Sequence, residues 1–90
     1  MYRYDFTVLS LKKIIEFNGS FWHANPKLYD RDWLNPVMFM TAQEIWDRDK
    51  DKRKLAEQQG FEVLTIWDND VKADKEKELK RCSDFISMKI

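Results

Sequence analysis

The 90-residue chain is 43% hydrophobic and 36% charged, which predicts one small folded domain and excludes a disordered segment or a pair of domains. Sixteen basic residues balance sixteen acidic ones, which argues against a simple charge-driven nucleic-acid binder but leaves a local basic patch open. No run approaches the about 20 apolar residues of a membrane span, and the start of the chain lacks a signal-peptide pattern. The single cysteine, Cys82, excludes an internal disulfide and a multi-cysteine zinc site, which favours a reducing compartment.

Two strands are predicted near the start of the chain. Residues 2–9 alternate aromatic or branched side chains with polar ones, and residues 13–17 form a second apolar run. The short link between these runs favours a hairpin. Residues 20–40 lose all periodicity, and two Asn-Pro pairs mark a long loop, whose aromatic residues argue against disorder.

A helix and a buried strand follow the loop. Thr41 and Glu44 match a capping box, and Gly60 suits the position after a helix end, which predicts a helix over residues 41–59. Residues 61–67 are typical of a buried strand. Asp68 or Asp70 is then predicted to cap one last helix, and the order β-β-loop-α-β-α predicts a single α/β domain. The apolar stripe expected on that last helix comprises Val71, Leu79, Cys82, Phe85 and Ile86.

Two carboxylates are predicted to face each other across the hairpin. If the chain turns about Ser10 and Leu11, Asp5 lies opposite Glu16, and Asn18 shares the face of Glu16. Like charges directly across a strand pair are destabilising, and a bound divalent cation would remove that penalty. The alternatives are a solvated sheet face or a shifted register.

Several charged and aromatic residues occupy positions that suggest a functional site. Asp49 and Lys52 fall in the middle of the core-facing stripe of the helix, where charges are costly unless they are paired or metal-linked; a salt bridge between the two is the simplest alternative. The only histidine, His23, follows a strand and could serve as a general base or be a structural residue. Phe21 and Trp22 are either core aromatics or residues that stack on nucleic-acid bases.

Four short stretches stand in order between residues 2 and 86. They read YDF at 4–6, IIEFNGSFWHANP at 14–26, EIWDRDKDK at 44–52 and GFEVLTIWDND at 60–70. Together they resemble the PD-(D/E)XK nuclease superfamily, in its branch of very-short-patch-repair endonucleases and phage homing endonucleases. The resemblance implies a restriction-endonuclease-like core and a single catalytic domain over residues 1–90. It also implies hydrolysis of double-stranded DNA in the cytoplasm of a bacterium or a phage-infected cell.

The resemblance also implies roles for individual residues. Asp5 and Glu16, with the backbone carbonyl of Phe17, would bind the metal, and such hard oxygen ligands suit Mg²⁺ or Mn²⁺. Asn18 stands where the superfamily usually has lysine, and His23 matches the histidine that serves as general base in this branch. The remaining matches are Asp49, an acidic helix residue of the motif, Lys52, a phosphate contact, and Phe21 and Trp22, which would contact DNA.

The chain departs from the family at three points. Ser20 and Asn25 occupy positions where the repair enzymes hold structural zinc, so no zinc is expected and the homing endonucleases fit better. The helix and first strand that precede YDF in the family are missing, which predicts a truncated core with exposed apolar surface. A homodimer or a partner chain could supply those elements. The neutral net charge leaves DNA affinity unexplained. The alternative functions are a mismatch-repair nickase and an inactive DNA-binding remnant.

Overall fold

The alternating residues near the start of the chain form a short antiparallel hairpin. In the computed structural model, which describes residues 5–87, β1 (Phe6–Val8) pairs with β2 (Lys13–Asn18), and a 3₁₀ turn joins them. Phe6 lies opposite Ile15, so the predicted register is confirmed. Of the strand predicted over residues 2–9, residues 2–4 lie outside the described part, and Leu9 belongs to the turn.

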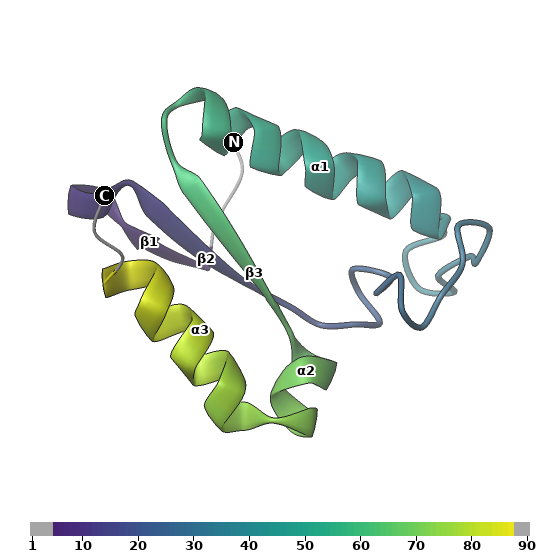
Figure 1. Ribbon diagram of the computed structural model, residues 1–90. Coiled ribbons are helices and arrows are strands. Elements are labelled where there is room, and N and C mark those ends of the chain that lie inside the picture. The colour runs from purple at the N-terminus through teal and green to yellow at the C-terminus, as the bar shows by residue number, and fades with distance from the viewer. Residues whose placement is uncertain (1–4, 88–90) are drawn as a thin grey trace.

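A parallel strand completes the sheet, and helices cover both of its faces (Figure 1). β3 (Glu62–Trp67) pairs in parallel with β2, and α1 (Ala42–Gln58) is part of the connection between them. Because side chains alternate along a strand, Glu16 and Asn18 point toward α1, whereas Ile15 and Phe17 point toward the C-terminal helix. The α/β class predicted from the sequence is confirmed, with the charged residues of β2 on the α1 face.

Helix α1 has the ends that the sequence predicts. The Thr41 hydroxyl accepts a hydrogen bond from the backbone N–H of Glu44, and the Glu44 carboxylate accepts one from the N–H of Thr41. These bonds lower the pKa of Glu44. The helix ends at Gln58, and Gly60 adopts a left-handed conformation with a φ of 89°. Both ends are therefore determined by local sequence.

The C-terminal region forms two helices, so the prediction of one last helix is wrong. α2 (Asp68–Ala73) and α3 (Lys75–Ser87) are separated at Asp74, whose side chain accepts a hydrogen bond from the N–H of Lys77 at 3.1 Å. The predicted cap is also wrong. Trp67 occupies the N-cap position of α2 without a side-chain hydrogen bond, and Asp68 lies within the helix, where its carboxylate accepts from Ser20 and from the N–H of Asn69.

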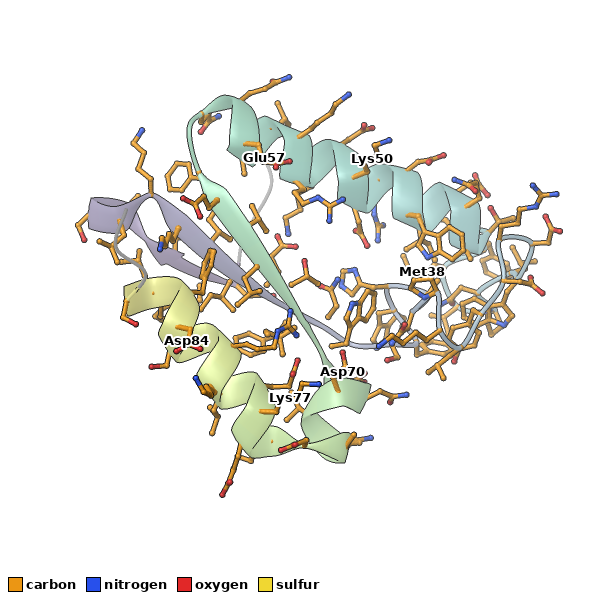
Figure 2. The ribbon with its side chains drawn as sticks, viewed as in Figure 1. Met38, Lys50, Glu57, Asp70, Lys77 and Asp84 are labelled. Carbon is orange, nitrogen blue, oxygen red and sulfur yellow. The ribbon has the colours of Figure 1, made fainter. Side chains whose placement is uncertain are left out.

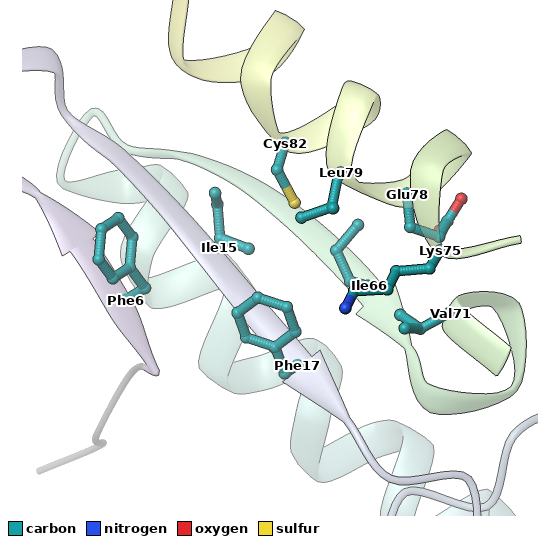
Figure 3. A pocket seen from close by; sticks show the side chains of 9 residues that line it. All are labelled: Phe6, Ile15, Phe17, Ile66, Val71, Lys75, Glu78, Leu79 and Cys82. Carbon is teal, nitrogen blue, oxygen red and sulfur yellow. The ribbon is translucent and has the colours of Figure 1, made fainter.

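The apolar stripe of α3 is only partly covered. Leu79 is 58% exposed, whereas Glu78 is buried and forms an ion pair with Arg81 at 2.6 Å. Between α3 and the sheet lies an open groove of about 250 Å³ (Figure 3). Its apolar lining residues are Phe6, Ile15, Phe17, Ile66, Val71, Leu79 and Cys82. The exposed apolar surface predicted from the sequence is therefore present on this face.

Two buried asparagines organise the long loop between β2 and α1. The side chain of Asn35 accepts hydrogen bonds from two backbone N–H groups and donates to the carbonyl of Phe21 at 3.2 Å. Asn25 accepts from the N–H of Lys27 and donates to Ser20 Oγ. Such side-chain bonds to nearby backbone replace regular secondary structure. The loop closes over a small core of Ala24, Ala42 and Ile45, with Trp33, Met38, Met40 and Trp46 packed against it.

No helix within residues 5–87 combines the length and the apolar character that a membrane crossing requires.

Candidate active site

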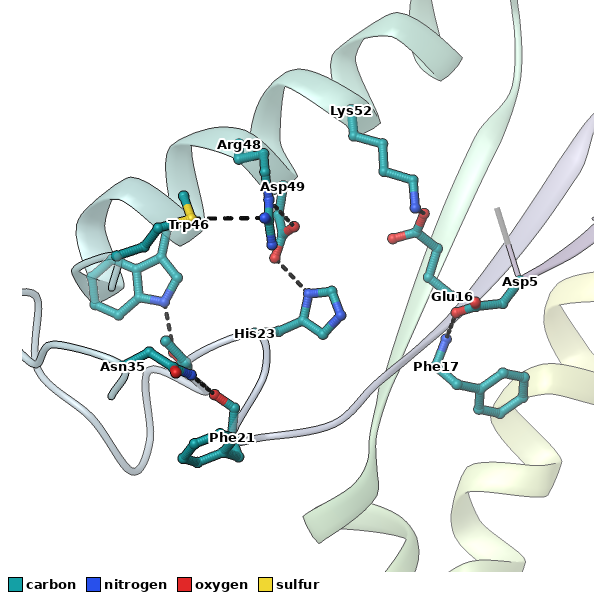
Figure 4. A network of polar contacts seen from close by, with 12 residues as sticks. Asp5, Glu16, Phe17, Phe21, His23, Asn35, Trp46, Arg48, Asp49 and Lys52 are labelled. Atoms are coloured by element: carbon teal, nitrogen blue, oxygen red, sulfur yellow. Dashed lines mark hydrogen bonds and ion pairs between the residues drawn. The ribbon is translucent and has the colours of Figure 1, made fainter. Parts of the chain in front are cut away.

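His23 and Asp49 form a close pair between the loop and α1 (Figure 4). His23 Nδ1 lies 2.7 Å from Asp49 Oδ2, and each side chain is 27% exposed. The loop positions His23 through a hydrogen bond from its N–H to the carbonyl of Gly19 at 3.0 Å. The other Asp49 oxygen lies 4.0 Å from Arg48 Nε. A carboxylate acceptor at Nδ1 leaves Nε2 of a neutral imidazole without a proton, so that nitrogen can accept one.

Glu16 and Lys52 form a second inward-facing pair. Lys52 Nζ lies 3.2 Å from Glu16 Oε1, and only 12% of the Glu16 side chain is exposed. Within residues 5–87, no hydrogen bond reaches this buried Glu16 oxygen, although the ammonium faces it as an ion-pair partner. The predicted placement of Lys52 on the inner face of the helix is confirmed. Its ion-pair partner is Glu16, however, and the simple salt bridge to Asp49 is not what the structure shows.

Asp5 lies just before β1, at the end of the hairpin. The paired residues end at Phe6 and Ile15, and the register continued by one position puts Asp5 opposite Glu16. The Asp5 carboxylate accepts a hydrogen bond from the backbone N–H of Phe17 at 2.7 Å. Asp5 is exposed, as is the Phe17 side chain. The hairpin thus brings Asp5 and Glu16 to the same end of β2, with Asp5 bound to the strand backbone and Glu16 pointing toward α1 (Figure 4).

A cavity of about 250 Å³ joins several of the predicted site residues. Glu16, Asn18, His23 and Asp49 all line it, and Asn18 is itself buried. Asp5, Phe17 and Lys52 do not line it. Its other walls are Pro26, Trp46, Lys50, Arg53, Thr65 and Trp67. The arrangement combines a proton acceptor, a buried carboxylate and cationic groups in one recess.

Sequence reasoning did not single out Lys50, Arg53 or Trp46. Arg53 lies four positions after Asp49 and three after Lys50, a spacing that places it near both on the helix surface. That spacing was the available signal, but the alternating charges of this segment also match a solvated helix face. Trp46 donates from its indole N–H to the carbonyl of Ala24 at 2.6 Å, which ties α1 to the residue after His23.

The donors near Glu16 fit a hard divalent cation in their chemistry. Glu16 offers a carboxylate whose buried Oε1 accepts no hydrogen bond from the described residues but faces the Lys52 ammonium at 3.2 Å. Asp5 lies one position beyond the paired residues of the hairpin, on the side of Glu16. Mg²⁺ commonly takes only one or two protein carboxylates and completes its shell with water and substrate phosphate. Among residues 5–87, no group of three His, Cys, Asp or Glu side chains could hold a metal, so a cation would depend on such additional ligands.

The predicted DNA-contacting aromatics have different environments. Phe21 packs edge-to-face against Trp33, with ring centroids 5.7 Å apart, and its carbonyl is bound by Asn35. Trp22 is 49% exposed and packs edge-to-face against Phe21 at 4.9 Å. Phe21 is therefore part of the loop structure, whereas Trp22 presents an aromatic surface to solvent.

Hydrogen bonds connect the start of the loop to Asp68, the first residue after β3. The N–H and hydroxyl of Ser20 both donate to Asp68 Oδ1, and the hydroxyl also accepts from Asn25 Nδ2 at 3.1 Å. The hydroxyl of Ser20 is the largest cause of the lowered pKa of Asp68. Ser20 and Asn25, which occupy the positions of zinc ligands in the repair enzymes that the chain resembles, thus bind each other. This network anchors the segment that carries His23.

Comparisons with models of protein families, with curated proteins and with solved structures found no match for this chain. Membership of the nuclease superfamily therefore stays a prediction from the motifs.

Proposed function

We propose that the chain is a metal-dependent DNA endonuclease with a PD-(D/E)XK core of the very-short-patch-repair and homing-endonuclease kind. The observation that carries the proposal is the His23–Asp49 pair in the wall of the cavity that Glu16 also lines. A histidine oriented by a carboxylate, next to a second carboxylate, is suited to activating water for hydrolysis. The motif resemblance adds the substrate, a phosphodiester bond of double-stranded DNA.

His23 supplies the base in this proposal. Its Nδ1–H donates to Asp49 Oδ2, which orients the ring and stabilises the imidazolium that forms after proton uptake. Nε2 then accepts the proton of the attacking water. Because both side chains are partly exposed, a water molecule can reach the pair from the cavity.

Glu16 and Asp5 would hold the cation, Mg²⁺ or Mn²⁺, with the backbone carbonyl of Phe17 as a third ligand. A bound cation of this kind polarises the phosphate and stabilises its developing charge. Lys52 balances the charge of Glu16 in the wall of the cavity. In this proposal the exposed Trp22, which precedes His23 in the chain, would contact a DNA base, whereas Phe21 packs within the loop.

One observation favours a second candidate, a DNA-binding module without turnover. Both carboxylates that would bind the cation already have protein partners, since Asp5 accepts from the N–H of Phe17 and Glu16 pairs with Lys52. In a protein that keeps the fold but binds no cation, both carboxylates would keep these protein partners.

Cutting of supercoiled plasmid separates the two candidates. With Mg²⁺, the endonuclease converts the plasmid to nicked or linear DNA, and EDTA stops the reaction. His23→Ala removes the base and should abolish cutting without unfolding the protein, whereas Asp51→Ala, an exposed α1 residue outside the cavity, serves as the matched control. Binding without cutting by a folded protein would support the second candidate, and a fully active His23→Ala protein would refute the role of His23.

A further inference from the structure

The α1 wall of the cavity carries two cationic side chains that the proposed chemistry does not use. Lys50 and Arg53 both line the cavity with His23 and Asp49, and both are exposed. They stand three positions apart on one helix, so their side chains leave neighbouring points of its surface. Figure 2 shows Lys50 on α1, across the sheet from α3.

These two cations differ from the other basic groups around the site. Lys52 pairs with Glu16, and Arg48 lies near both Asp49 and the sulfur of Met40. For Lys50 and Arg53, by contrast, the described part of the chain holds no ion-pair or hydrogen-bond partner. Their charges are exposed at the mouth of a recess and are not neutralised by the protein, which is where an anionic ligand gains most.

We propose that Lys50 and Arg53 bind the phosphate backbone of a DNA strand at the mouth of the cavity. The proposal rests on the proposed function only for the identity of the anion. Arginine presents a planar fork that matches a phosphate, and lysine adds a mobile point charge. The pair supplies a local basic surface in a chain whose sixteen basic and sixteen acidic residues cancel overall.

The pair also changes the role expected of Lys52. The resemblance offered Lys52 as the phosphate contact, but the structure directs its ammonium to the Glu16 carboxylate. In this proposal Lys50 and Arg53 contact the DNA phosphates, and Lys52 forms an ion pair with the Glu16 carboxylate. The cavity therefore has an anion-binding mouth and a carboxylate-bearing interior.

Fluorescence anisotropy of a labelled DNA duplex in EDTA tests the proposal, because binding is then measured without cleavage. Lys50→Gln/Arg53→Gln is compared with Lys77→Gln/Lys80→Gln, which removes the same charge from exposed positions of α3 on the other side of the sheet (Figure 2). Each phosphate contact contributes about 0.9 to the slope of log affinity against log salt, so the α1 variant should lose about two units of slope. The α3 variant should keep the slope of the unaltered protein.

Several outcomes would overturn the proposal. If both double variants lose the same slope, DNA binding depends on total charge and not on Lys50 and Arg53. If the unaltered protein shows no measurable affinity for the duplex, DNA is not its ligand. If the double variant fails to melt cooperatively by circular dichroism, Arg53→Lys, which keeps the charge, and Arg53→Gln replace it, and only the second should flatten the slope. Salt-dependent binding through this pair without any plasmid cutting would refute the endonuclease and leave the DNA contact standing. Plasmid cutting together with an unchanged salt slope in Lys50→Gln/Arg53→Gln would support the endonuclease and refute the DNA contact by these two residues.

Discussion

Asp49 fixes which nitrogen of His23 carries the proton, and a single-atom change should reveal it. In Asp49→Asn, the amide can donate to Nδ1 as readily as it accepts from it, so the proton can move to Nε2 and the base is lost. The rate of plasmid cutting should fall by about 10²- to 10⁴-fold. Asp51→Asn, an exposed change on the same helix, should leave the rate unaltered. An unchanged rate in Asp49→Asn would refute the tautomer argument.

Ser20 is the second residue whose loss should have a measurable effect. It is buried, and its hydroxyl binds both Asp68 and Asn25, so Ser20→Ala removes one hydrogen bond from Asp68 and leaves the buried Asn25 amide without this acceptor; it should cost about 1–3 kcal/mol of unfolding free energy. Urea unfolding at pH 7 measures this cost, and Ser83→Ala on exposed α3 is the control.

The same bond links stability to pH. Because the Ser20 hydroxyl holds the pKa of Asp68 below its ordinary value of 3.8 in the folded state, the unfolded chain binds the proton more readily. This contribution is therefore complete above pH 3.8 and is lost as the pH falls through the lowered value. In Ser20→Ala, the free energy of unfolding should decline less steeply over this acid range. An identical acid slope in both proteins would contradict the coupling.

At the scale of elements, Gly60 tests how α1 ends, and Gly19, which follows β2, serves as its control. Gly60 has a φ of 89°, so alanine there is strained, although its Cβ would meet Lys12 Cδ only at 3.7 Å. Gly60→Ala should lower the free energy of unfolding by about 1–2 kcal/mol. Gly19 lies outside the left-handed region, and an added Cβ would make an ordinary 3.5 Å contact with Trp22. Gly19→Ala should therefore be neutral or stabilising. Equal destabilisation of the two variants in urea would contradict this account.

Local sequence predicted the elements well where their ends are set by local bonds. The α1 capping box and the hairpin register need only residues within a few positions of one another. The division of the last helix at Asp74 was missed, because the charged stretch on either side continues a helical pattern. Burial of Glu78 in place of Leu79 was missed for a different reason, since it depends on how α3 packs on the sheet.

Four of the residues singled out in the sequence line the cavity, namely Glu16, Asn18, His23 and Asp49, but their contacts were not predicted. The stripe argument correctly placed Asp49 and Lys52 on the inner face of α1. Their partners come from other elements, His23 from the loop and Glu16 from β2, and depend on the crossover that brings α1 over the sheet. The turn of the Asp5 carboxylate to the Phe17 backbone likewise could not be read from alternation alone.

For the whole molecule, the reactivity of the Cys82 thiol should report how well α3 covers the groove against the sheet. Cys82 lines the groove, and burial raises the pKa of its thiol above the usual range. Less of the reactive thiolate is then present near neutral pH, so iodoacetamide should alkylate the folded protein more slowly than the protein in urea. Mass spectrometry of the labelled fraction over time measures both rates. Equal rates would show that α3 does not shield the thiol.

Association between molecules remains a prediction at this scale. Phe6, Phe17 and Leu79 are each at least half exposed around the groove, which is unusual for a small monomer. A second copy that covers these side chains would give a mass that rises with concentration in sedimentation equilibrium. A monomer throughout the accessible range would exclude the homodimer and leave a partner chain as the other alternative that the sequence offered.

The parallel pairing of β2 with β3 also has a consequence for how the chain reaches this structure. Lys12 donates to the carbonyl of Gln59, 47 positions away, and Ser20 binds Asp68, 48 positions away. Contacts this distant in sequence require closure of a long loop before they return any free energy, and folding slows as their share rises. Helix α1 can form early from its own capping bonds, whereas the recess between α1 and β2 has no floor until β3 has paired. We therefore expect the recess, and whatever chemistry it supports, to form only after β3 has paired with β2.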